Sequence, residues 1–82
     1  MAYDSSKELA RERGDLEKAD RDIIEGTQRL DQQRDLIARL AGQGHETGQA
    51  RALLENFQQM LEMWRDHRVL ILKRIAILER RT

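Results

Sequence analysis

The sequence predicts an all-α fold, a long antiparallel two-helix hairpin over about residues 5–41 and 47–80. Two series of apolar residues each recur every seven positions, a spacing that keeps one stripe of a helix facing a partner helix. Residues of the two series pair so that their numbers add to 87, as expected when a chain folds back on itself. The predicted intramolecular seam consists of Leu9, Leu16, Ile23, Leu30, Ile37, Ala50, Phe57, Trp64, Ile71 and Leu78.

The first helix is predicted to begin at Ser5, after a frayed segment over residues 1–4. Ser5 and Glu8 have the spacing of a capping box, in which each side chain bonds a backbone amide of the first turn. The helix should end near Ala41, because Gly42 suits the left-handed conformation that closes a helix.

Two glycines lie inside this first helix, and each costs about 1 kcal/mol relative to alanine in a helix interior. The pairing rule places Gly26 opposite Leu61 and close to Trp64, where a small residue lets a large one interdigitate. Gly14 lies away from the seam, and no packing reason for it is evident.

The turn is expected over residues 42–47, with Thr47 as the N-cap of the second helix. Beyond Gly48 the chain contains neither glycine nor proline, so the second helix can continue unbroken to about Arg80. At about 1.5 Å per residue, both helices reach roughly 50 Å.

Composition predicts a single domain over residues 1–82 with a thin core, because 37% of the residues are charged and only three are aromatic. Domains of this size usually need a disulfide, a metal or oligomerisation in addition to their core. The chain has no cysteine and only two histidines, which excludes a disulfide and a structural zinc site. Oligomerisation is the remaining route, and no cofactor is expected.

The second helix has more apolar side chains than one thin partner helix can cover. A second hairpin related by two-fold symmetry is the commonest solution, so we expect a homodimer that forms a four-helix bundle. An unidentified protein partner is the other expected occupant. The candidate oligomer or partner interface is Val69, Leu72, Ala76, Leu53 and Met60.

Overall charge indicates neither a membrane nor a nucleic-acid partner. Fifteen basic side chains balance fifteen acidic ones, so the net charge is zero. The longest apolar runs have four residues, and the N-terminal segment has no signal-peptide core, so we expect a cytoplasmic protein that does not bind a membrane.

Three residues are candidates for polar specificity: His45, His67 and Arg68. His45 falls in the turn, where a capping role is favoured over a phosphoacceptor or metal-ligand role. The pairing rule places His67 opposite Asp20, which predicts a hydrogen bond across the seam, with a pH-sensitive contact as the alternative.

Arg68 occupies a position where the seam would favour an apolar residue. Its opposite number is Ala19, so its guanidinium is expected to pair with Asp15 or Asp22, one turn to either side. An ion pair that sets the register is the favoured interpretation, and an anion-binding site is the alternative.

The sequence contains no phosphate-binding loop, metal-ligand cluster or nucleophile placed beside a base, so an enzyme is not expected. The preferred function is a helical self-association and protein–protein interaction module, one form of which is an accessory to bacterial signalling. The alternative is a nucleic-acid-binding dimer that uses Lys73, Arg74, Arg80 and Arg81. The third is an enzyme with an intersubunit anion-binding site.

One sequence pattern extends over a little more than half of the chain and consists of Glu25, Gly26, Arg29, Gln33, Leu36, Ile37, Leu40, Gly44, His45, Glu46, Thr47, Ala50, Leu53, Leu54, Phe57, Leu61 and Arg68. In this pattern the chain resembles short, uncharacterised helical-hairpin proteins of alphaproteobacteria. The resemblance rests on a glycine–histidine turn between two leucine-bearing helices, and it brings no catalytic residues. It implies structural roles for Gly26 and His45.

Overall fold

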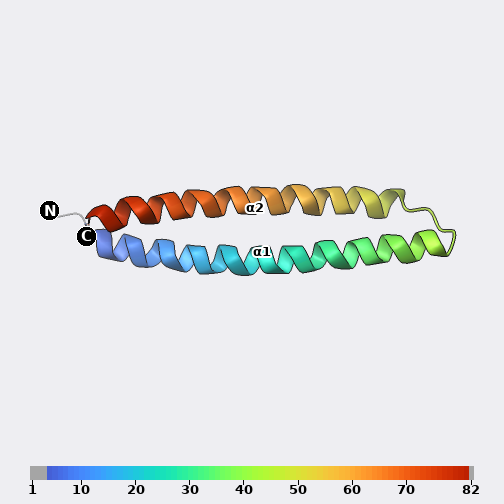
Figure 1. The fold of residues 1–82 in the computed structure, drawn as a ribbon, viewed down its shortest axis with the longest axis horizontal. Helices are drawn as coiled ribbons and strands as arrows, with labels where there is room; N and C mark the ends of the chain where they lie inside the picture. The colour runs from blue at the N-terminus through green and yellow to red at the C-terminus, as the bar shows by residue number, and fades with distance from the viewer. Residues whose placement is uncertain (1–3, 82) are drawn as a thin grey trace.

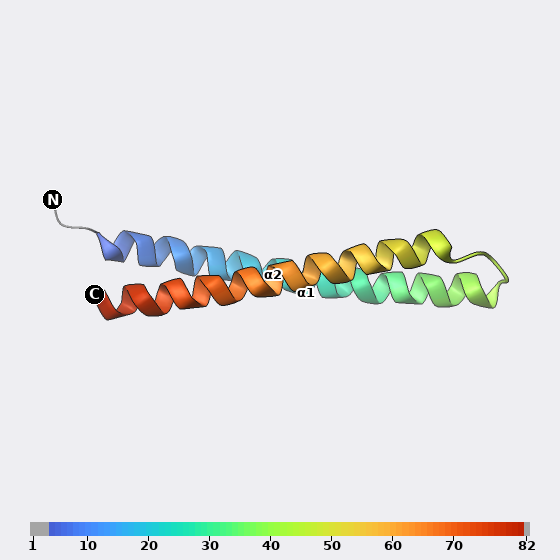
Figure 2. The same cartoon turned by 90° about the horizontal axis from the view of Figure 1, so that it is seen from above.

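The fold is an antiparallel pair of helices, α1 (Ser5–Gly42) and α2 (Gly48–Arg81), in a computed structural model that describes residues 4–81. The two helices lie side by side, with the connecting turn at one end and both chain ends at the other (Figure 1). Figure 2 shows them crossing at a shallow angle, and the molecule is a rod of 66 × 17 × 15 Å. The predicted all-helical hairpin is therefore confirmed.

The N-terminus of α1 differs from the prediction by one residue, because Asp4 and not Ser5 is the N-cap. The Asp4 carboxylate accepts hydrogen bonds from the backbone amides of Ser6 (3.1 Å) and Lys7 (3.2 Å). A carboxylate in this place also meets the positive end of the helix dipole. Asp4 is thus ordered as a cap, and the rest of the segment predicted to fray, residues 1–3, lies outside the described residues.

Helix α1 ends one residue later than predicted, at Gly42. Gly42 remains helical, and it is Gly44 that takes the left-handed conformation, with φ of 76°. The amide of His45 donates to the carbonyl of Leu40 (2.9 Å), and the amide of Gly44 donates to that of Ala41 (3.1 Å). These two bonds form a Schellman motif, which satisfies carbonyls that the helix end would leave unpaired.

Thr47 occupies the position before α2, where the sequence predicted its N-cap. Its carbonyl accepts a hydrogen bond from the backbone amide of Arg51, and its hydroxyl accepts one from Nε of the Arg51 side chain, both at 2.8 Å. The hydroxyl therefore anchors an arginine of the first turn. From Gly48 the helix continues unbroken to Arg81.

The core is a single seam between the two helices. All ten residues of the predicted seam are buried or half-buried. Towards the chain ends, Leu16 packs against a cluster of Leu9, Ala19, Ile71, Ile75 and Leu78. No segment of either helix, within residues 4–81, has the length and apolar character needed to cross a membrane.

Candidate interaction surface

Gly26 allows the closest approach of the two helices near the middle of the seam. A Cβ atom built at this position would lie 2.8 Å from Cζ3 of Trp64 and 3.3 Å from Cδ1 of Leu61. The indole ring therefore occupies the space that any larger residue would need. This agrees with the prediction that Gly26 accommodates Trp64, and at Gly14 a Cβ would meet nothing within 4 Å.

Glu12 is a buried acidic residue between the two helices, and its burial was not predicted from the sequence. Its side chain is 12% exposed, and Oε1 lies 3.9 Å from Nη1 of Arg74. The other carboxylate oxygen, Oε2, is buried without a hydrogen-bond partner. Its position seven residues before Ala19 was the available signal, because that series continues through buried Gly26 and Gln33.

Gln33 is the second buried polar residue of the seam. Its Nε2 donates to the backbone carbonyl of Ala50 at 2.9 Å, which ties α1 to the first turn of α2. A directed bond of this kind specifies which turns face each other, whereas apolar contacts tolerate sliding. Gln33 belongs to the same seven-residue series as Glu12, but the sequence does not reveal the acceptor of its hydrogen bond.

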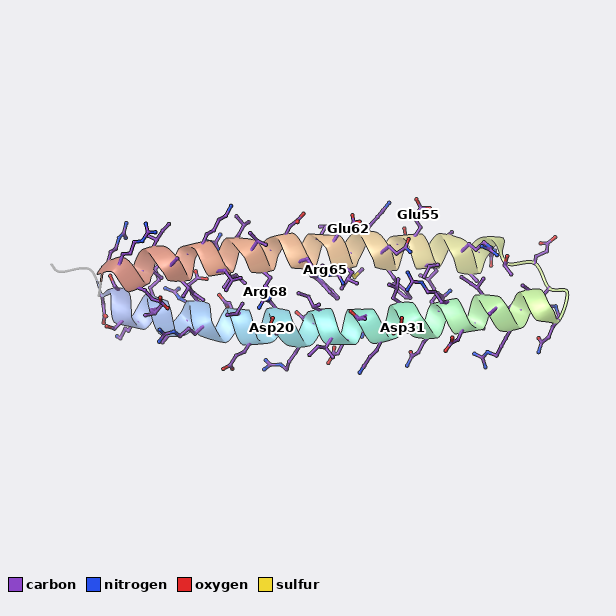
Figure 3. The ribbon with its side chains drawn as sticks, in the orientation of Figure 1. Asp20, Asp31, Glu55, Glu62, Arg65 and Arg68 are labelled. Atoms are coloured by element: carbon purple, nitrogen blue, oxygen red, sulfur yellow. The ribbon has the colours of Figure 1, made fainter. Side chains whose placement is uncertain are left out.

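Arg68 pairs with Asp20, and Figure 3 shows the two side chains facing one another between the helices. The Nε atom of Arg68 lies 2.5 Å from the Asp20 carboxylate. The prediction of a cross-seam ion pair for Arg68 was right in kind, but Asp15 and Asp22 were the wrong partners. The long side chain reaches the residue next to its opposite number, Ala19.

His67 does not form the predicted hydrogen bond with Asp20, which pairs with Arg68 through Oδ1. It is exposed, and it lines a shallow depression of ≈ 230 Å³ together with Asp15, Lys18, Ala19 and Asp22. Within residues 4–81 no three histidine or acidic side chains come together in a way that could hold a metal ion. His45 is exposed in the turn, where its backbone amide contributes to the cap of α1.

The most extended apolar surface runs along α2, on a flank that α1 leaves uncovered. We call it the outer stripe. Its members recur at intervals of seven, three, seven and seven residues, which places them on one side of a helix in a coiled coil. Their exposed fractions lie between 42% and 70%. They are Leu53, Met60, Met63, Leu70 and Ile77.

The predicted interface combines residues from two sides of α2. Val69 and Met60 are nine residues apart, so at about 100° per residue they point in opposite directions. Leu53 and Met60 belong to the outer stripe, whereas Val69, Leu72 and Ala76 lie on the other flank. All five are exposed, as the prediction requires, but no single partner helix can cover them together.

The exposed apolar surface of α1 is smaller. Its large exposed apolar side chains are Ile24 and Leu36, with exposed fractions of 59% and 37%. They are twelve residues apart, which is about 120° around the helix axis. Therefore α1 has no apolar stripe of its own, and α2 is the helix with surface to offer.

The basic residues near the end of α2 lie at the open end of the hairpin. Arg74 approaches Glu12 within the chain, while Arg80 and Arg81 form the last turn. Cations at this position complement the negative end of the helix dipole. In comparisons with protein families, curated proteins and solved structures, no match to the chain was found.

Proposed function

We propose that this protein is a non-enzymatic helical module that self-associates as a homodimer and presents its remaining helical surface to a protein partner. The observation that carries this proposal is the outer stripe. Five large apolar side chains lie in one line along α2, and all of them are left exposed by α1.

Physical considerations favour a partner for this stripe. Apolar surface contributes roughly 25 cal/mol per Å² when it is removed from water, so a long exposed line of it favours association. Contiguous exposed apolar patches on small proteins commonly mark interaction sites. The thin seam adds to the argument, because a hairpin of this size gains stability from a second copy.

Two neighbouring residues provide a matched test. Leu70 and Val69 have nearly equal exposed fractions, 49% and 47%, but only Leu70 lies on the outer stripe. We expect sedimentation equilibrium to show a dimer for the unmodified chain and for Val69→Glu. Leu70→Glu should be monomeric, because it would bury a carboxylate in the interface.

Two results would contradict this proposal. An unmodified chain that stays monomeric at several hundred micromolar would exclude self-association as the function. A monomeric Val69→Glu with a dimeric Leu70→Glu would move the interface to the other flank of α2. Circular dichroism must show unchanged helicity in both variants, since each substituted residue is exposed in the hairpin.

Nucleic-acid binding is the second candidate, favoured by four basic side chains within the last nine residues of α2. Phosphate contacts need little beyond such a cluster, and they weaken steeply with salt. This function predicts a salt-dependent gel shift of duplex DNA or RNA. Neutralising Lys73, Arg74, Arg80 and Arg81 together should abolish that shift and leave the dimer intact.

A further inference from the structure

The outer stripe has an internal symmetry that bears on how a second copy would pack. The numbers of Leu53 and Ile77 add to 130, and so do those of Met60 and Leu70. Met63 and His67 follow the same rule, and His67 is exposed beside the stripe. The seam inside the hairpin has a constant sum of the same kind, and there it describes two antiparallel helices in register.

We propose that the partner of the outer stripe is a second copy of this chain, whose α2 packs antiparallel to the first around a two-fold axis beside Arg65. This inference rests on the proposed self-association and adds its orientation and register. Each residue of the stripe then meets its opposite number from the second copy. The stripe covers itself, with no other protein required.

The resulting layers are well matched. Leu53 meets Ile77 and Met60 meets Leu70, each twice, which gives four entirely apolar layers over about 36 Å of helix. The two layers next to the axis each combine Met63 with His67. A methionine side chain is flexible and polarisable, and it packs favourably against the edge of a ring.

Charge distinguishes this orientation from a parallel one. In a parallel dimer in register, Arg74 would meet Arg74 of the second copy, and Arg81 would meet Arg81. In the antiparallel register Arg74 meets Asn56, and Arg81 meets Gln49, so the stripe itself contains no pair of like charges. Beside the axis, Asp66 approaches Asp66 of the second copy, which is the one like-charge contact of this register next to the stripe. Like-charge contacts across an interface are costly, so the two arginine layers of the parallel dimer select against the parallel packing.

A row of exposed residues on α2 flanks the outer stripe and allows the register to be measured without substituting a residue of the stripe itself. Ala52, Gln59, Asp66, Lys73 and Arg80 are all exposed and are spaced seven apart, so they share one side of the helix. The chain has no native cysteine, so a single cysteine at each position can carry one nitroxide spin label. Pulsed electron–electron double resonance on the full chain then measures the distance between the labels at the same position in the two copies.

The antiparallel register predicts a V-shaped series of distances. Labels at Asp66 should be closest, with an axial separation of about 3 Å, added to the lateral spacing of the helices. The axial separation should rise to about 18 Å at Gln59 and about 24 Å at Lys73. At Ala52 and Arg80 it should reach about 39 and 45 Å.

The outcomes separate this inference from the proposed function. A dimer with equal distances at all five positions would be parallel, which would overturn the register and leave self-association standing. A minimum away from Asp66 would likewise overturn the proposed axis. A chain that sediments as a monomer would overturn both, and a dimer with the V-shaped series supports both.

A charge substitution gives a second, independent readout of the register. Asn56→Glu would place a carboxylate opposite Arg74 of the second copy, and we expect the dimer dissociation constant to fall about threefold to tenfold. Asn56→Lys should raise it by a similar factor, with hairpin helicity unchanged. Equal constants for the two variants would contradict the pairing of residues 56 and 74.

Discussion

The inner and outer stripes of α2 are alike in sequence but differ in their surroundings. The inner stripe consists of the seam residues on this helix, Ala50, Phe57, Trp64, Ile71 and Leu78. Ile71 is 1% exposed and its neighbour Leu70 is 49% exposed, although both are large apolar residues in seven-residue series. The inner stripe is covered by α1, whereas the outer one is not covered by this chain. Hydrophobicity alone therefore does not distinguish the two stripes, and the fold shows that only the inner one makes its contact within the molecule.

The largest expected effect separates these two neighbours. Ile71→Ala removes the most buried large side chain and should lower the free energy of unfolding by about 2–5 kcal/mol at every protein concentration. Leu70→Ala should leave the hairpin itself within about 0.5 kcal/mol, because an exposed side chain loses little packing. Its effect should appear only as a weaker dependence of stability on protein concentration.

Urea unfolding at 5 and 500 micromolar would measure both effects. The unmodified chain should unfold at a higher urea concentration in the more concentrated sample, and Leu70→Ala should reduce that difference. Equal losses for both variants at both concentrations would show that the two stripes do not differ in role.

Two glycines sharpen the comparison between the seam and the outside of the hairpin. Gly14→Ala should raise the free energy of unfolding by about 1 kcal/mol, because its Cβ would meet nothing within 4 Å. Gly26→Ala should lower it by about 1–2 kcal/mol, since a Cβ 2.8 Å from Trp64 forces the ring to move. Thermal and urea unfolding of both variants would show the opposite signs.

Trp64 supplies the control for this pair of variants. In a Trp64→Leu background the ring is gone, so Gly26→Ala should lose most of its penalty, while the effect of Gly14→Ala should not change. If Gly26→Ala costs the same in both backgrounds, contact with Trp64 is not the reason for the glycine.

The sequence was sufficient for the seam because the seam depends on periodicity, which every residue of the repeat supports. It was less reliable where one hydrogen bond decides the outcome. Asp4 and Ser5 both suit an N-cap, and Gly42 and Gly44 both suit a left-handed residue, so backbone geometry selected between neighbours. The general pattern was predictable, but the choice between adjacent candidates was not.

The same limit applies to the polar residues of the seam and to the outer stripe. Asp20 adjoins the position opposite Arg68, so the partner is set by how far a long side chain reaches. The intervals of the outer stripe were present in the sequence, but total apolar content obscured them. Dividing the residues between two flanks required knowing which side α1 covers.

Glu12 tests whether the seam would be more stable if it were entirely apolar. Glu12→Leu should raise the free energy of unfolding by about 1–2 kcal/mol, because it removes a buried carboxylate with an unpaired oxygen. Glu17→Leu, at an exposed position of the same helix, is the control and should change little. A loss of stability in Glu12→Leu would mean that the contact with Arg74 outweighs the cost of burial.

The smallest expected effect concerns the Arg68–Asp20 ion pair. Its side chains are 39% and 47% exposed, so solvent screens the attraction and the pair should contribute no more than about 1 kcal/mol. A double-mutant cycle with Arg68→Ala and Asp20→Ala, measured by urea unfolding at 0.05 and 1 M salt, would isolate that term. The coupling should shrink at high salt, because screening weakens an exposed pair. A coupling well above 1 kcal/mol that did not respond to salt would mean that this pair stabilises the seam as a desolvated contact. The distinction between the stripes would then depend on polar as well as apolar burial.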